Sequence, residues 1–213
     1  MFKSPSVITI SRQLGSGGAY LGQLLAEQLG ILYLDREIVI EAAKQLQVLE
    51  EDLEHRDEKK TSFWQSVLQL SAYNPPDMYT PPEIYIPSDQ DLYKAESHII
   101  RKVAQEHSAV IIGRGGSCLL RDHPRHFSVF LHADLPFRQQ RVEKLYNLST
   151  SEAKKFVEKS DRERGQYLQT FAGRDWNDAR LYHLAIDTGV VGLEQAKELI
   201  LAGIQSHFES VPD

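Results

Sequence analysis

The stretch VITISRQLGSGGAYLGQLLAEQLG, residues 7–30, decides the fold class of this chain, because it joins three patterns in one run. Residues 7–10 are a short, mostly β-branched run, which is typical of a buried parallel strand. A glycine-rich loop follows at residues 11–18, and then apolar residues at helical spacing with Gly30 as a C-terminal stop. In a strand, loop and helix of this kind, backbone N–H groups converge near the positive end of the helix dipole. The sequence therefore predicts a phosphate-binding loop.

The loop departs from the pattern G-x-x-x-x-G-K-[ST] at the two positions that carry chemistry. That pattern supplies a lysine for the β- and γ-phosphates and a hydroxyl group for Mg²⁺. If Gly15 and Gly17 are aligned with its last two loop glycines, the lysine position holds Gly18 and the hydroxyl position holds Tyr20. Arg12 then stands at the first glycine. A strand–turn–helix connection that binds no phosphate is therefore the alternative interpretation of this stretch alone.

The composition is that of an ordinary globular domain. The 213 residues are 41% hydrophobic and 25% charged, which suits one domain with a substantial core. A formal net charge of −6 argues against non-specific binding to nucleic acid or to an anionic membrane. The single cysteine, Cys118, excludes an internal disulfide and fits a reducing compartment, and no long apolar run indicates export or membrane spanning. We therefore expect a cytoplasmic protein.

Four further apolar runs predict the remaining strands of a sheet, at residues 31–34, 109–112, 127–132 and 182–186. Five such runs separated by helical patterns predict a doubly wound, parallel α/β sheet. Between the second and third runs, helical patterns flank a proline-rich stretch at residues 73–82 that cannot be regular structure. An insertion at this place is favoured as a segment that covers a substrate.

Charged residues follow two of the predicted strands at their carboxyl ends, where open α/β sheets bind ligands. Asp35 and Arg36 follow the second strand, and Arg114 follows the third. Asp35 is also a good N-cap for the next helix, so capping and acceptor binding are both open. For Arg114 we favour a phosphate contact, because a structural arginine after so apolar a strand would need a buried partner.

Four more arginines lie in predicted helices. Arg138 and Arg141 are three residues apart on one helix face and could meet either a phosphate group or the nearby Glu143. Arg162 and Arg164 alternate with acidic residues, which fits either a phosphate-binding lid or a solvated face. The eight histidines show no metal-ligand spacing, so we expect no zinc site.

Six segments, in this order, resemble the nucleoside monophosphate (NMP) kinases, and most closely the cytidylate kinase-like proteins, whose phosphate loop reads S-R-x-x-G-S-G-G. The segments are ISRQLGSGG, LYLDRE, VIIGRGG, FLHADLPFRQQR, SDRERGQY and AIDTG. The resemblance covers residues 7 to about 208 and implies a single P-loop kinase domain with three α/β/α layers. It implies a core at residues 6–36, 108–148 and 180–210, an NMP-binding insertion at about 37–107 and an arginine-rich lid at about 149–179. The implied reaction is transfer of the γ-phosphoryl group of ATP to CMP or dCMP, with Mg²⁺.

The resemblance also implies roles for single residues. The ATP phosphates are expected over the loop, at Gly15, Ser16, Gly17, Gly18, Ala19 and Tyr20. The acceptor monophosphate is expected at Asp35, Arg36, Arg114 and Arg141. The charge of the moving phosphoryl group is expected to be neutralised by Arg12, Arg138, Arg162 and Arg164. Mg²⁺ is expected to be held mostly by ATP phosphates and water, with Ser16 as the nearest hydroxyl group.

The departures leave a second hypothesis from a different class. Well-characterised cytidylate kinases keep the loop lysine and hydroxyl, and they carry Asp-Gly-Arg where this chain has residues 112–114, Ile-Gly-Arg. A missing lysine could cost several orders of magnitude in rate unless Arg12, Arg162 or Arg164 replaces it. The alternatives are therefore a nucleotide-binding regulator or pseudokinase without turnover, and a kinase for another small phosphorylated acceptor.

Overall fold

A computed structural model describes residues 4–42 and 90–210, and in these ranges five strands form one parallel sheet in the order β2-β3-β1-β4-β5. The strands are β1 (Val7–Arg12), β2 (Leu32–Leu34), β3 (Ala109–Ile112), β4 (His126–His132) and β5 (Leu184–Asp187). The central strand β1 places Ile8 opposite Val110 of β3 on one side and Phe127 of β4 on the other. The predicted five-stranded parallel sheet is therefore confirmed.

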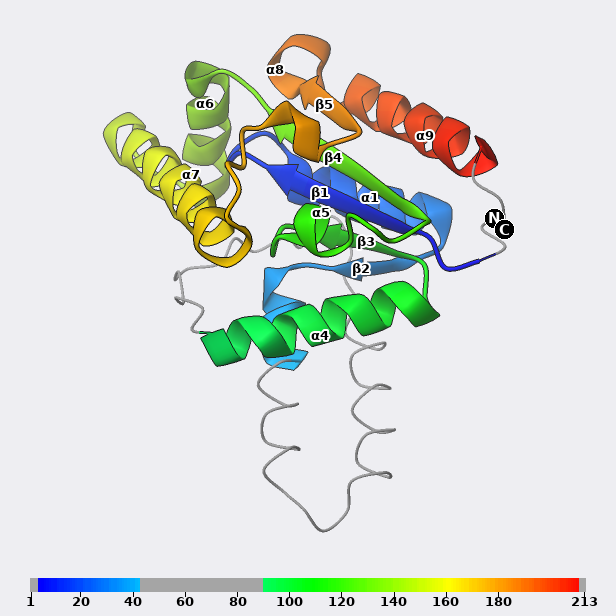
Figure 1. Cartoon of the computed structure of the whole chain (residues 1–213). Coiled ribbons are helices and arrows are strands. Elements are labelled where there is room, and N and C mark those ends of the chain that lie inside the picture. Colours follow the sequence, from blue (N-terminus) through cyan, green and yellow to red (C-terminus); the bar gives the residue numbers. More distant parts are fainter. Residues whose placement is uncertain (1–3, 43–89, 211–213) are drawn as a thin grey trace.

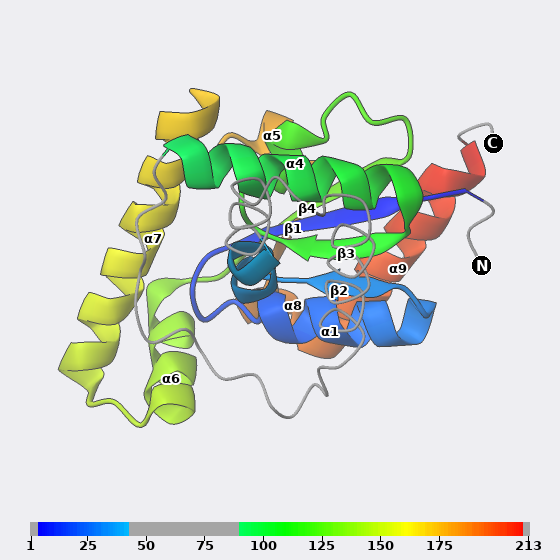
Figure 2. The ribbon, with the colours of Figure 1, turned by 90° about the horizontal axis from the view of Figure 1, so that it is seen from below.

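Helices cover both faces of the sheet and complete three layers, as Figures 1 and 2 show. One face carries α1 (Gly18–Leu29) and α9 (Leu193–Ser210), and the other carries α4 (Gln90–Glu106) and α5 (Gly116–Leu119). Because both faces are covered, β-branched residues such as Ile8 and Ile111 are fully buried. Burial of a side chain of this size contributes about 1.5–3 kcal/mol, and the sheet is accordingly the centre of the hydrophobic core.

Two helices stand beyond the carboxyl ends of the strands. They are α6 (Leu135–Tyr146) and α7 (Thr150–Ala172), which pack against each other (Figures 1 and 2). Both begin at side-chain caps: Asp134 accepts a backbone N–H group of α6 at 2.9 Å, and Ser149 forms a capping box with Glu152. Caps of this kind are worth about 1 kcal/mol each, and here they fix where the two helices begin.

In the part of the chain that the structure describes, the segments between strands and long helices contain three one-turn elements that the sequence does not predict. They are α5, the 3₁₀ helix η2 (Ala179–Leu181) and α8 (Thr188–Val191). Elements this short have no periodic apolar pattern, and glycines, which are typical of turns, precede α5 at Gly115 and lie within α8 at Gly189. Within the described ranges, no helix is both long and apolar enough to cross a membrane.

The predicted insertion is described only at its two ends. Residues 36–42 are helical, and Asp35 caps this helix by accepting the N–H groups of Glu37 at 3.0 Å and Ile38 at 3.1 Å. The other end is α4. The rest of the insertion, including the proline-rich stretch, lies outside the described residues, so its role as an NMP-binding segment stays a prediction.

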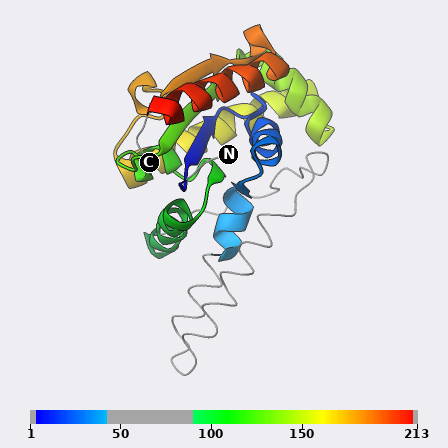
Figure 3. The ribbon, with the colours of Figure 1, turned by 90° about the vertical axis from the view of Figure 1, so that its right-hand side faces the viewer.

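A buried histidine lies at the amino ends of the strands, which face the viewer in Figure 3. His126, the first residue of β4, is 3% exposed, and its Nε2 atom shares a 2.7 Å hydrogen bond with the hydroxyl of Thr9. Burial lowers the pKa of His126 to about 3, and the neighbouring His183, His123 and His207 act in the same direction. The folded protein therefore keeps this ring neutral at pH values at which the unfolded chain protonates it.

Acid is consequently expected to destabilise the fold through His126. Stability from a neutral, buried histidine is complete above the unfolded-state pKa of 6.5 and is lost as the pH falls towards the folded-state value. Between about pH 7.5 and pH 5 this residue should lower the free energy of unfolding by about 2 kcal/mol. Urea unfolding of wild type and His126→Asn at both pH values measures the effect. An equal pH-dependent loss in the two proteins would contradict the assignment, because asparagine does not titrate.

Candidate active site

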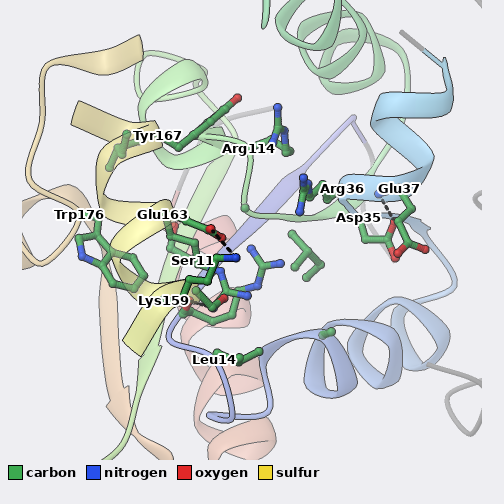
Figure 4. A pocket seen from close by; sticks show the side chains of 18 of the residues that line it. Ser11, Leu14, Asp35, Arg36, Glu37, Arg114, Lys159, Glu163, Tyr167 and Trp176 are labelled. Carbon is green, nitrogen blue, oxygen red and sulfur yellow. Dashed lines mark hydrogen bonds and ion pairs between the residues drawn. The ribbon is translucent and has the colours of Figure 1, made fainter. Parts of the chain in front are cut away.

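A cavity of about 460 Å³ lies between the carboxyl ends of the central strands and α7 (Figure 4). The sheet side of the cavity is formed by Arg12 of β1, residues 35–37 after β2 and residues 112–115 after β3. This is the edge at which open α/β sheets bind ligands. The structure therefore brings together Arg12, Asp35, Arg36 and Arg114, which come from three separate segments of the sequence.

One face of α7 forms the opposite wall. The lining residues recur every three or four positions, which is the period of an α-helix, and they include Phe156, Lys159, Ser160, Glu163, Arg164 and Tyr167. This stripe is about 17 Å long at 1.5 Å per residue. Its charged residues lie in the middle, with an aromatic residue at each end.

Further aromatic residues extend both ends of this wall. Tyr146 lines the cavity beside Phe156, with the two ring centroids 4.9 Å apart. Trp176 and Tyr182 line the cavity together with Tyr167. Burial raises the pKa of Tyr182 to about 12, so its phenol stays protonated. The cavity therefore has a charged centre between two aromatic ends.

Arg114 is held by a buried ion pair. It is 8% exposed and pairs with Glu96 of α4, whose carboxylate is fully buried. Tyr167 of α7 donates to the same carboxylate at 3.2 Å, and the guanidinium lies 4.2 Å from the centroid of its ring. Burial is the largest cause that raises the pKa of Tyr167, which therefore remains a donor. Glu96 is the buried partner that a structural arginine requires, so Arg114 joins three elements as well as lining the cavity.

Arg138 does not line the cavity and instead fixes the glycine loop. It is 7% exposed, and its Nε atom donates to the carbonyl of Ala133 at 2.9 Å. Its Nη1 atom donates to the carbonyl of Leu14 at 3.2 Å and to Asp161 of α7 at 2.5 Å. Asp161 in turn accepts the N–H group of Leu14 at 2.9 Å. In the structure Arg138 therefore connects the glycine loop to α7, and the direct contact with the moving phosphoryl group that the resemblance implies stays a prediction.

The other three predicted arginines of α6 and α7 lie in different places relative to the cavity. Arg164 lines the cavity, and its Nη1 atom donates to the backbone carbonyl of Arg12 at 3.4 Å. Arg162 is exposed and lines a second, open groove on the outer face of α7. Arg141 is half-buried outside the cavity, 5.9 Å from the ring of Phe137, and burial lowers its pKa. Of these three predicted residues, only Arg164 is brought to the cavity.

Lys159 is a cation of the site that the sequence reasoning missed. It lines the cavity from α7, and its side chain is 66% exposed, with Nζ 3.8 Å from Glu163 (Figure 4). The sequence does indicate this position, because Lys159 is three residues from Phe156 and four from Glu163, a spacing that places all three on one helical face.

Two loop glycines are required by the fold itself. Gly15 and Gly17 both have φ near +86°, a left-handed conformation that favours glycine. A Cβ atom at Gly15 would lie 2.6 Å from the carbonyl oxygen of Arg138, and one at Gly17 would collide with Leu193 of α9. These contacts explain both glycines without a ligand, so a Gly17→Val substitution would test packing rather than phosphate binding.

Ser16 and Tyr20, two hydroxyl-bearing residues expected to contact ATP, do not line the cavity. Ser16 is fully buried, and its hydroxyl lies within hydrogen-bond distance of the carbonyls of Gln13, at 2.8 Å, and Leu131, at 3.1 Å. Tyr20 is exposed and does not line the cavity. In the structure the Ser16 hydroxyl thus contacts backbone carbonyls, and its expected place near Mg²⁺ stays a prediction. The described part of the chain also holds no group of three or more His, Cys, Asp or Glu residues suited to a metal ion.

The start of α1 does fit an anion. Its N-cap is Gly17, which supplies no side-chain hydrogen bond to the first helical turn. The N–H groups of this turn, residues 18–20, therefore lack the acceptor that a serine or aspartate cap would provide. Ala19 of this turn lines the cavity. An uncapped helix start at a ligand-binding sheet edge favours a phosphate group through both its N–H groups and its dipole.

Comparison with known proteins agrees with this geometry. Residues 7–190 match the family described as the cytidylate kinase-like family. A stretch of 111 residues is 31% identical to the cytidylate kinase of Pyrococcus abyssi (strain GE5 / Orsay). This stretch makes up 52% of this chain and only 60% of that enzyme.

Solved structures show the same architecture. An uncharacterized protein from Eubacterium ventriosum ATCC 27560 has a TM-score of 0.72 at 25% identity, over 95% of this chain and 99% of that one. A gluconokinase from Sinorhizobium meliloti 1021 has a TM-score of 0.51 at 16% identity, over 98% of this chain and 99% of that one. The fold is the three-layer α/β kinase fold that the sequence predicts, and the chain belongs to the cytidylate kinase-like family.

Proposed function

We propose that this protein is a nucleotide kinase-type phosphotransferase that moves the γ-phosphoryl group of ATP to a nucleoside monophosphate. The observation that carries the proposal is the convergence of cations from separate elements on one cavity: Arg12, Arg36, Arg114, Lys159 and Arg164. Phosphoryl transfer depends mainly on positioning and on neutralising the charge of the phosphates, which is what such a cluster provides.

The aromatic ends of the cavity support nucleotides as ligands. Bases stack on aromatic side chains with little dependence on sequence, at about 1–3 kcal/mol for each base. Phe156 and Tyr146 offer such surfaces at one end of the α7 wall, and Tyr167 and Trp176 at the other. CMP or dCMP is the favoured acceptor because the family and the matching enzyme of Pyrococcus abyssi are named for cytidylate.

In this proposal the two phosphate groups bind to different parts of the cavity. The ATP phosphates lie at the uncapped start of α1, near Ala19, and the acceptor phosphate lies between Arg36 and Arg114. An oxygen atom of the acceptor attacks the γ-phosphorus, and ADP leaves. Arg164 stabilises the negative charge on the transferred group. Mg²⁺, when bound with ATP, would supply further charge neutralisation.

The second candidate is a nucleotide-binding regulator without turnover. The replacement of the loop lysine and hydroxyl by Gly18 and Tyr20 favours it. A coupled ADP-release assay with a panel of nucleoside monophosphates separates the two candidates, with ATP hydrolysis in the absence of acceptor as its control. Acceptor-dependent ADP release supports the kinase. Binding of ATP without ADP release for any acceptor supports the regulator.

If Arg36 grips the acceptor phosphate, Arg36→Ala should raise the KM for the acceptor at least about tenfold, because a hydrogen bond to a charged group contributes about 1.5–3 kcal/mol. The KM for ATP should change by less than about twofold, since ATP lies at the start of α1 in this proposal. Steady-state kinetics with each substrate varied in turn measures both values. Arg101→Ala, an exposed arginine of α4, is the matched control. Equal rises in both KM values would place Arg36 outside the acceptor site.

A further inference from the structure

We propose that Arg12 is the catalytic cation of the glycine loop, and that residue 18 is glycine because the side chain of Arg12 lies across it. This inference rests on the proposed phosphotransfer function. It assigns to the last residue of β1 the charge that a loop lysine supplies in the pattern G-x-x-x-x-G-K-[ST].

Gly18 shows the first part of the arrangement. A Cβ atom at this residue would lie 2.6 Å from Cγ and 2.7 Å from Cβ of Arg12. These atoms are at the root of the arginine side chain, so they cannot move aside cheaply. Gly18 is the first residue of α1, and unlike Gly15 and Gly17 it is not among the glycines with positive φ. The need for glycine here therefore comes from Arg12 and not from the backbone conformation.

Gly113 shows where the charged end of Arg12 lies. This glycine follows β3, and a Cβ atom on it would collide with Nη1 of Arg12. The arginine therefore extends from the end of β1 across the start of α1 to the end of β3, and it lines the cavity. Its guanidinium is thus placed between the uncapped helix start and the residues after β3.

The charge of Arg12 is also available to a ligand. Across residues 4–42 and 90–210 no acidic side chain is paired with it, whereas Arg114 is paired with Glu96 and Arg164 lies 3.6 Å from Asp161. Its backbone is held on both sides, by pairing with Leu131 of β4 and by the hydrogen bond from Arg164. A fixed guanidinium beside helix N–H groups can bind phosphate oxygens through two parallel hydrogen bonds.

The pattern G-x-x-x-x-G-K-[ST] has glycine at the end of the strand and lysine at the start of the helix. This chain has the reverse arrangement, with Arg12 at the end of β1 and Gly18 at the start of α1. Both pairs bring one cation to the same region. The two cations exclude each other, because the first carbon atoms of a lysine at position 18 would occupy the space of the arginine stem. The effects of substitutions at residues 12 and 18 should therefore depend strongly on each other.

Four proteins test this coupling: wild type, Arg12→Ala, Gly18→Lys and the double variant, with Arg121→Ala as a control for loss of an exposed arginine. Each is measured for kcat, for affinity towards a fluorescent ADP analogue, and for melting temperature. Arg12→Ala should lower kcat at least about tenfold with an unchanged melting temperature. Gly18→Lys alone should lower kcat and the melting temperature. The double variant loses the contact with Cγ of residue 12 but keeps the one with its Cβ, so it should regain part of the melting temperature that Gly18→Lys loses, and it should exceed Arg12→Ala in both kcat and ADP affinity.

Two results would overturn the inference: full kcat in Arg12→Ala, or a double variant no better than Arg12→Ala in ADP affinity and no more stable than Gly18→Lys. Failure of the proposed function is a separate outcome, in which wild type releases no ADP with any acceptor. The ADP affinities and melting temperatures of the four proteins then still decide whether Arg12 occupies the place of the lysine.

Discussion

Glu96→Ala is expected to lower the free energy of unfolding by about 3–5 kcal/mol, because it leaves the buried guanidinium of Arg114 without its partner. This is a large share of the about 5–15 kcal/mol that stabilises a typical domain. The substitution also removes the acceptor of the Tyr167 hydroxyl and so breaks one contact between α7 and α4. Urea unfolding at neutral pH measures the loss.

Two companion variants make this expectation specific. Glu106→Ala removes an exposed carboxylate of the same helix, 3.8 Å from Lys102, and should change stability by less than about 0.5 kcal/mol. Glu96→Leu combined with Arg114→Met removes both charges together and should recover most of the stability, since no unpaired charge is then buried. If Glu96→Ala is as stable as Glu106→Ala, the ion pair does not hold the fold together.

Asp161→Ala is expected to lower kcat/KM about 100-fold, because it releases the glycine loop from the helix that faces it. Asp161 binds the N–H group of Leu14, which lies in the loop, and pairs with Arg138 of α6 and with Arg164. Its loss also leaves Arg138, with a side chain only 9% exposed, as an uncompensated charge. Steady-state kinetics and amide exchange at Leu14 report the two consequences.

Asp161→Asn keeps an oxygen acceptor for Leu14 but loses the charge, so its activity should lie between wild type and Asp161→Ala. Glu158→Ala, an exposed acidic residue of the same helix, should behave as wild type. Unchanged exchange of the Leu14 amide in Asp161→Ala would show that the loop keeps its position without this contact.

The strands and helix caps can be predicted from the sequence because their signals are local. β3 begins and ends with the apolar run at residues 109–112, and α7 begins at the capping box of Ser149 and Glu152. The buried partner of Arg114 is different, because Glu96 lies 18 residues earlier and in another element. A weak signal exists even there, since Glu96 falls on the apolar stripe of α4, and a carboxylate in such a stripe calls for a buried cation.

The residues that line the cavity follow from the sequence where strand ends place them, and follow less well where helix phase or tertiary contact does. Arg162 and Arg164 are two residues apart, which separates them by about 200° around an α-helix, so they could not both face one cavity. The burial of Arg138 depends on Asp161, which is 23 residues away, and no local pattern indicates it. Geometry within one helix was thus available from the sequence, whereas contact between helices was not.

The wall formed by α7 has a consequence for how this cavity can change in evolution. Since the wall is one stripe of a single helix, each substitution at Phe156, Lys159 or Tyr167 alters one patch of the cavity and leaves the backbone in place. A deletion of one residue near Ala153 would instead turn the rest of the stripe by about 100°. Residues that do not line the cavity, such as Asp161 and Gly165, would then take the places of Ser160 and Arg164 on the cavity wall. Ligand preference in related chains is therefore expected to diverge by point substitution along α7, with the length of this helix held constant.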